Sequence, residues 1–201
     1  MKFGDGTLIT VVRPAFVAAS VAWALLLPLV PFVASRPHAT PIGTALLIAG
    51  YAIGSAICHQ LPERSYHLWT AQMPVCARCT GIYFGAAIAA VVSYVARGFQ
   101  PRDRGPAASA PEALRRASPK LGESADERRR ERAARRRHGT ARLTLLIAAL
   151  PTLATLVYEW ATGHMPAHWI RAATGVPLGA TAAWMVLSSM PRRTRAENRV
   201  N

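Results

Sequence analysis

Five long stretches of this sequence contain no charged residue, and they constrain the fold more than any other feature. The hydrocarbon core of a bilayer is about 30 Å thick, and a helix that crosses it needs roughly 20 apolar residues. We therefore predict an all-α fold, a polytopic bundle of about five transmembrane helices, or four if the first stretch does not span. The stretches are residues 14–35, 37–57, 79–96 (expected to extend back to about Pro74), 143–158 and 172–190.

The charged residues are separated from these apolar stretches. Hydrophobic residues make up 51% of the chain, yet its formal net charge is +14. Residues 97–141 hold twelve arginines, one lysine and six acids among Pro, Ser and Gly. Such a segment buries too little apolar surface to stay folded, although Glu/Arg pairs at helical spacing favour a surface helix over residues 126–137. We predict a flexible loop.

This alternation divides the chain. We expect three transmembrane helices in residues 1–96, an Arg-rich flexible cytoplasmic loop in 97–141, two transmembrane helices in 142–191 and a basic cytoplasmic tail in 192–201. The positive-inside rule places both basic regions in the cytoplasm. Five crossings then put the N-terminus outside, which Lys2 and Arg13 oppose. The first stretch is too long for the core of a cleaved signal, so we expect it to be retained.

The basic regions also indicate a partner. Clustered arginines beside a membrane favour contact with anionic lipid headgroups as well as with the bilayer itself. Arginines bind nucleic-acid phosphates too, but no aromatic residues are interleaved here to stack on bases. We therefore do not expect a nucleic-acid partner, and the sequence identifies no protein partner.

Two connections between the stretches carry most of the reactive side chains. The connections after the second and fourth stretches are separated by two crossings, so they share one face of the membrane in either orientation. With a cytoplasmic Arg-rich loop, that face is extracytoplasmic. The first connection carries Cys58, His59, Glu63, Arg64, His67, Cys76 and Cys79, and the second carries Glu159, His164, His168 and Arg171.

Two sequence blocks in this region are the most specific feature of the chain. Residues 58–66 read CHQLPERSY, and residues 74–83 read PVCARCTGIY. They resemble an uncharacterised prokaryotic membrane protein family, domain of unknown function 2085, which is recognised by a CHQ-x-PERS stretch followed by PVCARCTGIY. A later R-x-x-T-G element, Arg171 to Gly175, also looks matched, so the resemblance extends over about residues 43–183. It implies a multi-pass protein of the prokaryotic (inner) cell membrane with a shared site, but no established activity.

The cysteines in these blocks favour a metal site. Cys76-x-x-Cys79 puts two sulfurs within reach of one ion, and tetrahedral zinc takes four nitrogen or sulfur ligands. Cys58 and His59 are the nearest candidates for the other two. His67, or His164 and His168 from the other connection, would be substitutes for His59. We predict a zinc-type site of Cys58, His59, Cys76 and Cys79, structural or regulatory.

Two other interpretations of the same residues stay open. In a thiol–disulfide oxidoreductase, Cys76 and Cys79 would form a reversible disulfide, Cys58 would exchange with it, and Arg78 with a helix N-terminus would lower a thiol pKa. In a structural or accessory subunit, the thiols would pack as small apolar residues. A c-type haem is disfavoured, because Thr80 stands where C-x-x-C-H needs histidine. Whether the protein is an enzyme is left open.

The remaining features of the shared face have less specific interpretations. Glu159 and Arg171 could form a functional ion pair, but we favour anchoring at the membrane interface, beside the aromatic residues expected there. These aromatic residues are Trp69, Tyr158, Trp160 and Trp169. Many relatives of the resembled family carry Asp-Gly where this chain has Glu159-Trp160. Gly81 and Gly85 suit close helix packing and not phosphate binding.

Overall fold

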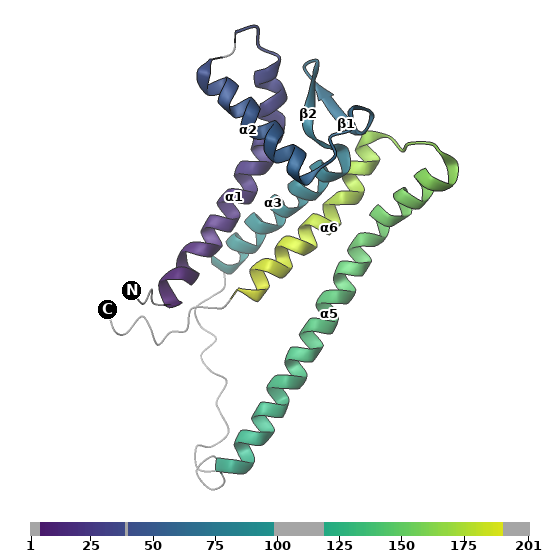
Figure 1. The fold of residues 1–201 in the computed structure, drawn as a ribbon. Coiled ribbons are helices and arrows are strands. Elements are labelled where there is room, and N and C mark those ends of the chain that lie inside the picture. Colours follow the sequence, from purple (N-terminus) through teal and green to yellow (C-terminus); the bar gives the residue numbers. More distant parts are fainter. Residues whose placement is uncertain (1–4, 39, 99–118, 191–201) are drawn as a thin grey trace.

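The computed structural model describes residues 5–38, 40–98 and 119–190, and most of them are helical. Figure 1 shows long helices running along the length of a bundle, with a shorter helix and a β-hairpin gathered at one end of it. The fold class predicted from the apolar stretches is confirmed. The elements are α1 (Asp5–Ala34), α2 (Pro41–Ile57), the 3-10 helix η1 (Pro62–Arg64), β1 (Ser65–Leu68), β2 (Ala71–Cys76), α3 (Ala77–Gly98), α5 (Pro119–Thr162) and α6 (His168–Ser189).

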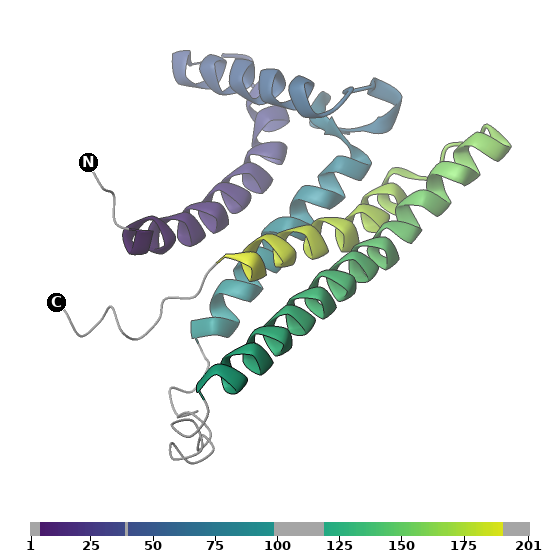
Figure 2. The ribbon, with the colours of Figure 1, turned by 60° about the horizontal axis from the view of Figure 1, so that its bottom comes forward.

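In the part of the chain that the structure describes, four helices are long and apolar enough to cross a membrane, which is the lower of the two predicted counts. They are Val11–Ala34 within α1, Ala77–Ala96 within α3, Gly139–Thr162 within α5, and α6. The stretch that falls short is the second and not the first. Its helix, α2, has 17 residues, and Figure 2 shows it lying at a steep angle to α3, α5 and α6.

Glycines explain why α2 turns back instead of crossing. A Cβ on Gly50 would lie 2.4 Å from the side chain of Val30, and one on Gly43 would lie 3.1 Å from that of Val33. The glycine face of α2 therefore packs directly on the end of α1. As a result, α1 begins at the end of the bundle where α3 and α6 end (Figure 1). This arrangement differs from the expected one, in which five crossings put the start of the chain opposite the basic regions.

Arg13, which opposed that prediction, has a structural role at the end of the bundle where α1 begins and α6 ends, called the basic end below. Its Nη2 donates hydrogen bonds to the carbonyl oxygens of Leu187 (3.0 Å) and Met190 (2.9 Å). A cation at the C-terminus of a helix satisfies carbonyl groups that have no partner within the helix. Arg13 thus joins the first described helix to the end of the last one. Lys2 lies outside the described residues.

The hairpin pairs β1 with β2 in antiparallel register, with Ser65 opposite Cys76 and Leu68 opposite Ala71. The two turn residues, Trp69 (φ 49°) and Thr70 (φ 71°), are both left-handed, as a two-residue type I′ turn requires. The expectation that the third helix extends back to Pro74 is wrong. That segment is strand because it pairs with β1 and buries its side chains against α1.

The helices α3 and α6 run in the same direction and form the most extensive helix contact of the molecule (Figure 1). A Cβ on Gly81 would lie 1.8 Å from the carbonyl oxygen of Ala172, and one on Gly179 would lie 1.8 Å from that of Ile82. Gly85 approaches the opposite backbone almost as closely. Small residues four apart allow such backbone contact between membrane helices. The prediction that Gly81 and Gly85 serve helix packing is confirmed.

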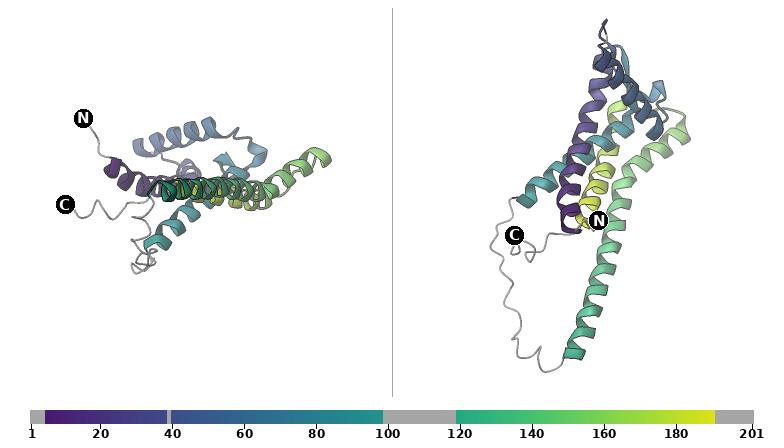
Figure 3. Two further views of the ribbon diagram at one scale, coloured as in Figure 1. Left: turned by 90° about the horizontal axis from the view of Figure 1, so that it is seen from below. Right: turned by 60° about the vertical axis from the view of Figure 1, so that its left-hand side comes forward.

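The helix α5 packs beside α6, where Thr152 Oγ1 donates a 2.8 Å hydrogen bond to the carbonyl oxygen of Thr174. The right-hand view of Figure 3 shows α5 extending past the other helices at the basic end of the bundle. The helix expected over residues 126–137 is part of this extension. Residues 99–118 of the expected loop, and the tail from residue 191, lie outside the described residues.

Candidate metal centre

Three elements bring the three cysteines together. Cys58 follows the last turn of α2, Cys76 ends β2, and Cys79 lies in the first turn of α3. Their Sγ atoms all lie within 4.8 Å of one another. The backbone N–H of Cys76 also donates a 3.2 Å hydrogen bond to the Sγ of Cys58. The site therefore joins residues that are 18 positions apart.

The position of Cys58 depends on the close approach of α2 to the hairpin. A Cβ on Gly54 would lie 2.1 Å from the carbonyl oxygen of Pro74 and 2.5 Å from Nε2 of Gln60. The backbone of Cys58 then leaves the helix in an extended conformation (φ −150°, ψ 143°). Only a glycine at position 54 permits this geometry.

Gln60 clamps the same region, and sequence reasoning gave it no role. Its left-handed backbone (φ 49°) turns the amide inward, where Nε2 donates to the carbonyl oxygens of Tyr51 (3.0 Å) and Pro74 (2.6 Å). In return, Gln72 donates a 2.7 Å hydrogen bond to the carbonyl oxygen of Gln60. The sequence did offer one sign of this role, because Gln60 ends the block CHQ (residues 58–60), just before the PERS stretch (residues 62–65). Gln60 fixes the chain that carries Cys58 against the strand that leads to Cys76.

The surroundings of the sulfurs are apolar. Cys58 and Cys79 pack against a buried cluster of Leu27, Met73 and Val75. A hydrophobic shell of this kind limits solvent access to a metal–thiolate site. Among the described residues, no carboxylate belongs to the group that the three sulfur atoms form.

Hydrogen bonding lowers the pKa of the Cys76 thiol below its usual value. The largest cause is a hydrogen bond from the Cys79 thiol; burial opposes it, and the backbone N–H groups of Cys79 and Arg78 support it. The helix N-terminus thus acts as expected. The expected contribution of the Arg78 guanidinium is wrong, because its Nη2 donates to Thr155 Oγ1 (3.1 Å) and Glu159 Oε1 (3.3 Å) instead.

The predicted histidine does not join the sulfurs. The side chain of His59 is exposed, and its ring nitrogens are not part of the 4.8 Å group. His67, on β1, and His164, in the connection between α5 and α6, are also exposed. His164 Nδ1 instead lies 2.9 Å from the carbonyl oxygen of Thr162. Among the described residues, the chain presents three sulfur ligands and leaves the fourth position of a tetrahedron open.

The other predicted site residues surround this centre at the same end of the bundle. Glu63 is exposed and Arg64 half-buried, both in η1. His168 begins α6, and its ring lies 5.5 Å from that of Tyr66 on β1. The two connections therefore meet, as the count of crossings predicted. The sequence identified this end of the molecule correctly, although none of the predicted histidines joins the group that the three cysteines form.

Glu159 and Arg171 form a buried ion pair. Arg171 Nε lies 3.1 Å from Glu159 Oε1, and the two residues are only 1% and 7% exposed. Anchoring at the membrane interface, the interpretation that we favoured, is therefore wrong for these two residues. Trp160 and Trp169, at 84% and 68% exposure, remain consistent with an aromatic belt.

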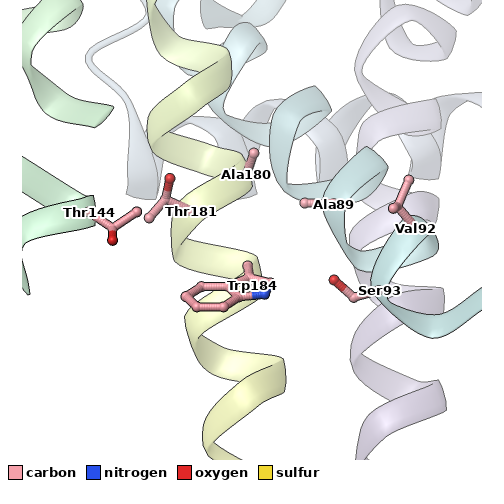
Figure 4. Close-up of a pocket in the computed structure, with 7 residues that line it drawn as sticks. All are labelled: Ala89, Val92, Ser93, Thr144, Ala180, Thr181 and Trp184. Atoms are coloured by element: carbon pink, nitrogen blue, oxygen red, sulfur yellow. The ribbon is translucent and has the colours of Figure 1, made fainter. Parts of the chain in front are cut away.

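A groove of about 370 Å³ lies elsewhere, between α3, α5 and α6. Figure 4 shows its lining, in which Trp184 of α6 faces small side chains of the neighbouring helices. The lining residues are Ala89, Val92, Ser93, Thr144, Ala180, Thr181 and Trp184. The groove contains none of the cysteines or histidines, so it is separate from the candidate centre.

Comparison with known proteins supports the interpretation of the motif blocks. Residues 58–108 match the family described as "Predicted membrane protein (DUF2085)". The resemblance seen in the sequence is thus confirmed over that segment, which holds all three cysteines.

Archaeal relatives match the chain over short segments. An uncharacterised protein of Methanocaldococcus jannaschii is 38% identical over 64 residues, which are 32% of this chain and 41% of that protein. An uncharacterised protein of Methanothermobacter thermautotrophicus is 57% identical over 30 residues, 15% of this chain and 27% of that protein. The chain therefore spans less than half the length of these relatives. No solved structure matches the chain significantly.

Proposed function

We propose that this membrane protein binds a zinc-type metal ion through Cys58, Cys76 and Cys79, and that the ion has a structural or regulatory role. The observation that carries the proposal is the convergence of three sulfurs within 4.8 Å. Thiolates around tetrahedral zinc lie about 2.3 Å from the metal, and so roughly 3.8 Å from each other. The cysteines need only a small closure to reach that geometry. The ion would then hold α2, the hairpin and α3 together.

We assign His59 as the fourth ligand of the loaded site. It follows Cys58 directly in the chain, and its side chain is exposed. The extended backbone at Cys58 lets a change of ψ move the next residue without unwinding α2. If His59 stays outside, a water molecule would complete the tetrahedron, as in zinc sites that keep one position open.

The proposal places the site on the extracytoplasmic face of the prokaryotic cell membrane. The start of α1, the extension of α5 and the end of α6 all lie at the opposite end of the bundle (Figure 1). The extension of α5 carries seven arginines between residues 128 and 137, and α1 carries Arg13 near its start. The positive-inside rule assigns such an end to the cytoplasm. There the arginines would contact anionic lipid headgroups.

Metal analysis of the full chain tests the proposal. Protein purified in detergent with zinc supplied should hold about one zinc per chain, and Cys76→Ser should hold none. His59→Ala should lose its zinc to a chelator faster than His67→Ala, a matched control at another exposed histidine. Metal-free wild-type protein whose three thiols are all reduced would refute the proposal.

Thiol–disulfide exchange is the second candidate, and the lowered pKa of Cys76 favours it. In this reaction, the thiols of Cys76 and Cys79 would lose two electrons and two protons to a quinone-class acceptor. A sulfur–sulfur bond would form, the quinone would become a quinol, and Cys58 would exchange with the bond. Trapping of free thiols in intact cells separates the two candidates, because three permanently reduced or metal-shielded thiols exclude a cycling disulfide. An accessory subunit with inert thiols would instead copurify with a larger complex and tolerate all three Cys→Ser changes.

A further inference from the structure

A second polar cluster lies beside the cysteine centre, on another face of α3. Glu159 Oε1 accepts a hydrogen bond from Arg78 Nη2 (3.3 Å) and lies 3.1 Å from Arg171 Nε in an ion pair. The side chains of Arg78, Glu159 and Arg171 are 12%, 5% and 1% exposed. The cysteines pack toward α1 and β2, whereas Arg78 points to α5. The cluster is therefore not part of the proposed zinc site.

The hydrogen bonding of this cluster is incomplete. Glu159 Oε2 is buried and has no hydrogen-bond partner among the described residues, and the same holds for Nε of Arg78. Nε of Arg171 lies close to Oε1 but is not aligned to donate to it. Leaving a buried charged group without hydrogen bonds is costly, and more so in a membrane. Two donors, Nε of Arg78 and Nε of Arg171, and one acceptor, Oε2 of Glu159, therefore lack a hydrogen-bond partner in the same cluster.

The charge of the cluster is also unbalanced. Two guanidinium groups share one carboxylate, and Glu159 is the one acid paired with either arginine in the described part of the chain. The cluster therefore carries a net charge of +1. A buried charge persists only if a counter-charge or hydrogen bonds compensate it. An anion would supply what the protein lacks.

We propose that this cluster binds an oxyanion that carries a hydroxyl group, namely hydrogen phosphate or a phosphate monoester. Guanidinium groups match the geometry and charge of phosphate oxygens. Glu159 Oε2 accepts only, so the ligand must also donate a hydrogen bond. Hydrogen phosphate has a P–OH group, whereas sulfate is fully deprotonated at neutral pH. Glu159 thus selects phosphate against sulfate.

Two sources could supply this group. One is free inorganic phosphate, and the other is the headgroup of a lipid that ends in a phosphate monoester, such as phosphatidic acid. A phosphodiester headgroup such as phosphatidylglycerol has no P–OH at its phosphorus. The lipid source and the free ion share one chemistry, which the experiment below separates.

Binding of radiolabelled inorganic phosphate to the full chain in detergent is the direct test. We expect saturable binding near one per chain, with sulfate competing at least about tenfold more weakly, because a hydrogen bond to a charged group is lost. Glu159→Gln should reduce this preference toward unity, since its amide can donate to sulfate. Arg142→Gln, at an exposed arginine of α5, is the matched control and should keep it.

Nanodiscs distinguish the sources. Stronger thermal stabilisation by phosphatidic acid than by phosphatidylglycerol, with displacement of the labelled phosphate, supports a lipid ligand; stabilisation by inorganic phosphate alone supports the free ion. Absence of binding to both phosphate and phosphatidic acid would overturn the proposal. So would equal competition by sulfate in the wild type, which remains decisive even if Glu159→Gln fails to fold.

Discussion

Gly179→Ala should force α3 and α6 apart. The added Cβ would lie 1.8 Å from the carbonyl oxygen of Ile82, while ordinary van der Waals contact begins at 3.4 Å. The obstructing atom belongs to a helix backbone, so no side chain can rotate away. Relief requires that the helices separate by about 1.6 Å, the difference between these two distances.

The cost of this separation follows from the contacts that it breaks. A radial gap of 0.5–1 Å already removes roughly a quarter to a half of the dispersion energy between packed atoms. Overpacking in a well-packed interior costs about 1–3 kcal/mol. The contact between α3 and α6 is the most extensive in the protein, so we expect a loss at the upper end, about 3 kcal/mol of unfolding free energy.

Gly139→Ala is the matched control, because a Cβ at Gly139 meets nothing within 4 Å. Replacing a helical glycine by alanine in open space should stabilise the helix by about 0.5–1 kcal/mol. The same substitution should therefore act in opposite directions at the two positions. Reversible unfolding in mixed micelles, followed by circular dichroism against the mole fraction of denaturing detergent, measures both.

Equal unfolding free energies for the two variants would refute the backbone contact between α3 and α6. Gly81→Ala examines the same contact from the other helix, since its Cβ would lie 1.8 Å from the carbonyl oxygen of Ala172. A large loss at Gly179 with none at Gly81 would show that the register of the two helices differs from the one described.

Three further predictions concern the topology and the cysteines. Reporters fused to the two ends of the chain should lie on one side of the membrane, with the cysteines labelled from the other; reporters on opposite sides would mean that α2 crosses. In metal-free protein, iodoacetamide should modify Cys76 at a rate that changes little between pH 8 and 6, because its lowered pKa keeps the thiolate populated. Mass spectrometry follows this, and a rate falling about tenfold per pH unit, as for an ordinary thiol, would contradict it. Gly54→Ala should weaken zinc binding in a titration by displacing α2 from Pro74, 2.1 Å from the new Cβ. Gly43→Ala, whose Cβ would meet side-chain atoms of Val33 (3.1 Å) and Thr40 (3.2 Å) and no backbone of the hairpin, should bind as the wild type does.

The membrane bundle was predictable because hydropathy is a local property of the chain. The second stretch was assigned wrongly because α2 is as apolar as a span, and only its contact with Val30 and Val33 shows that it turns back. Glycines in an apolar run predict close packing but not its partner. Counting α2 as a span also changed the number of crossings, and so the end of the bundle at which we expected α1 to begin.

The cysteine centre was predictable in part. The spacing of Cys76 and Cys79 and the count of crossings both pointed to one end of the molecule. The role of Gln60 could not be predicted, because its partner Pro74 is 14 positions away. The ion pair of Glu159 was equally non-local, since a charge near a helix end suits anchoring and pairing alike until Arg78 is placed beside it.

The parallel contact of α3 and α6 has a consequence for biogenesis. The chain up to Gly98 and the chain from Pro119 each hold two of the four candidate spans. Each half can insert into the bilayer as an independent helical hairpin, and the glycine-lined seam would then dock the two within the membrane. Two separately translated fragments should therefore reassemble into a functional protein, as in split-protein complementation.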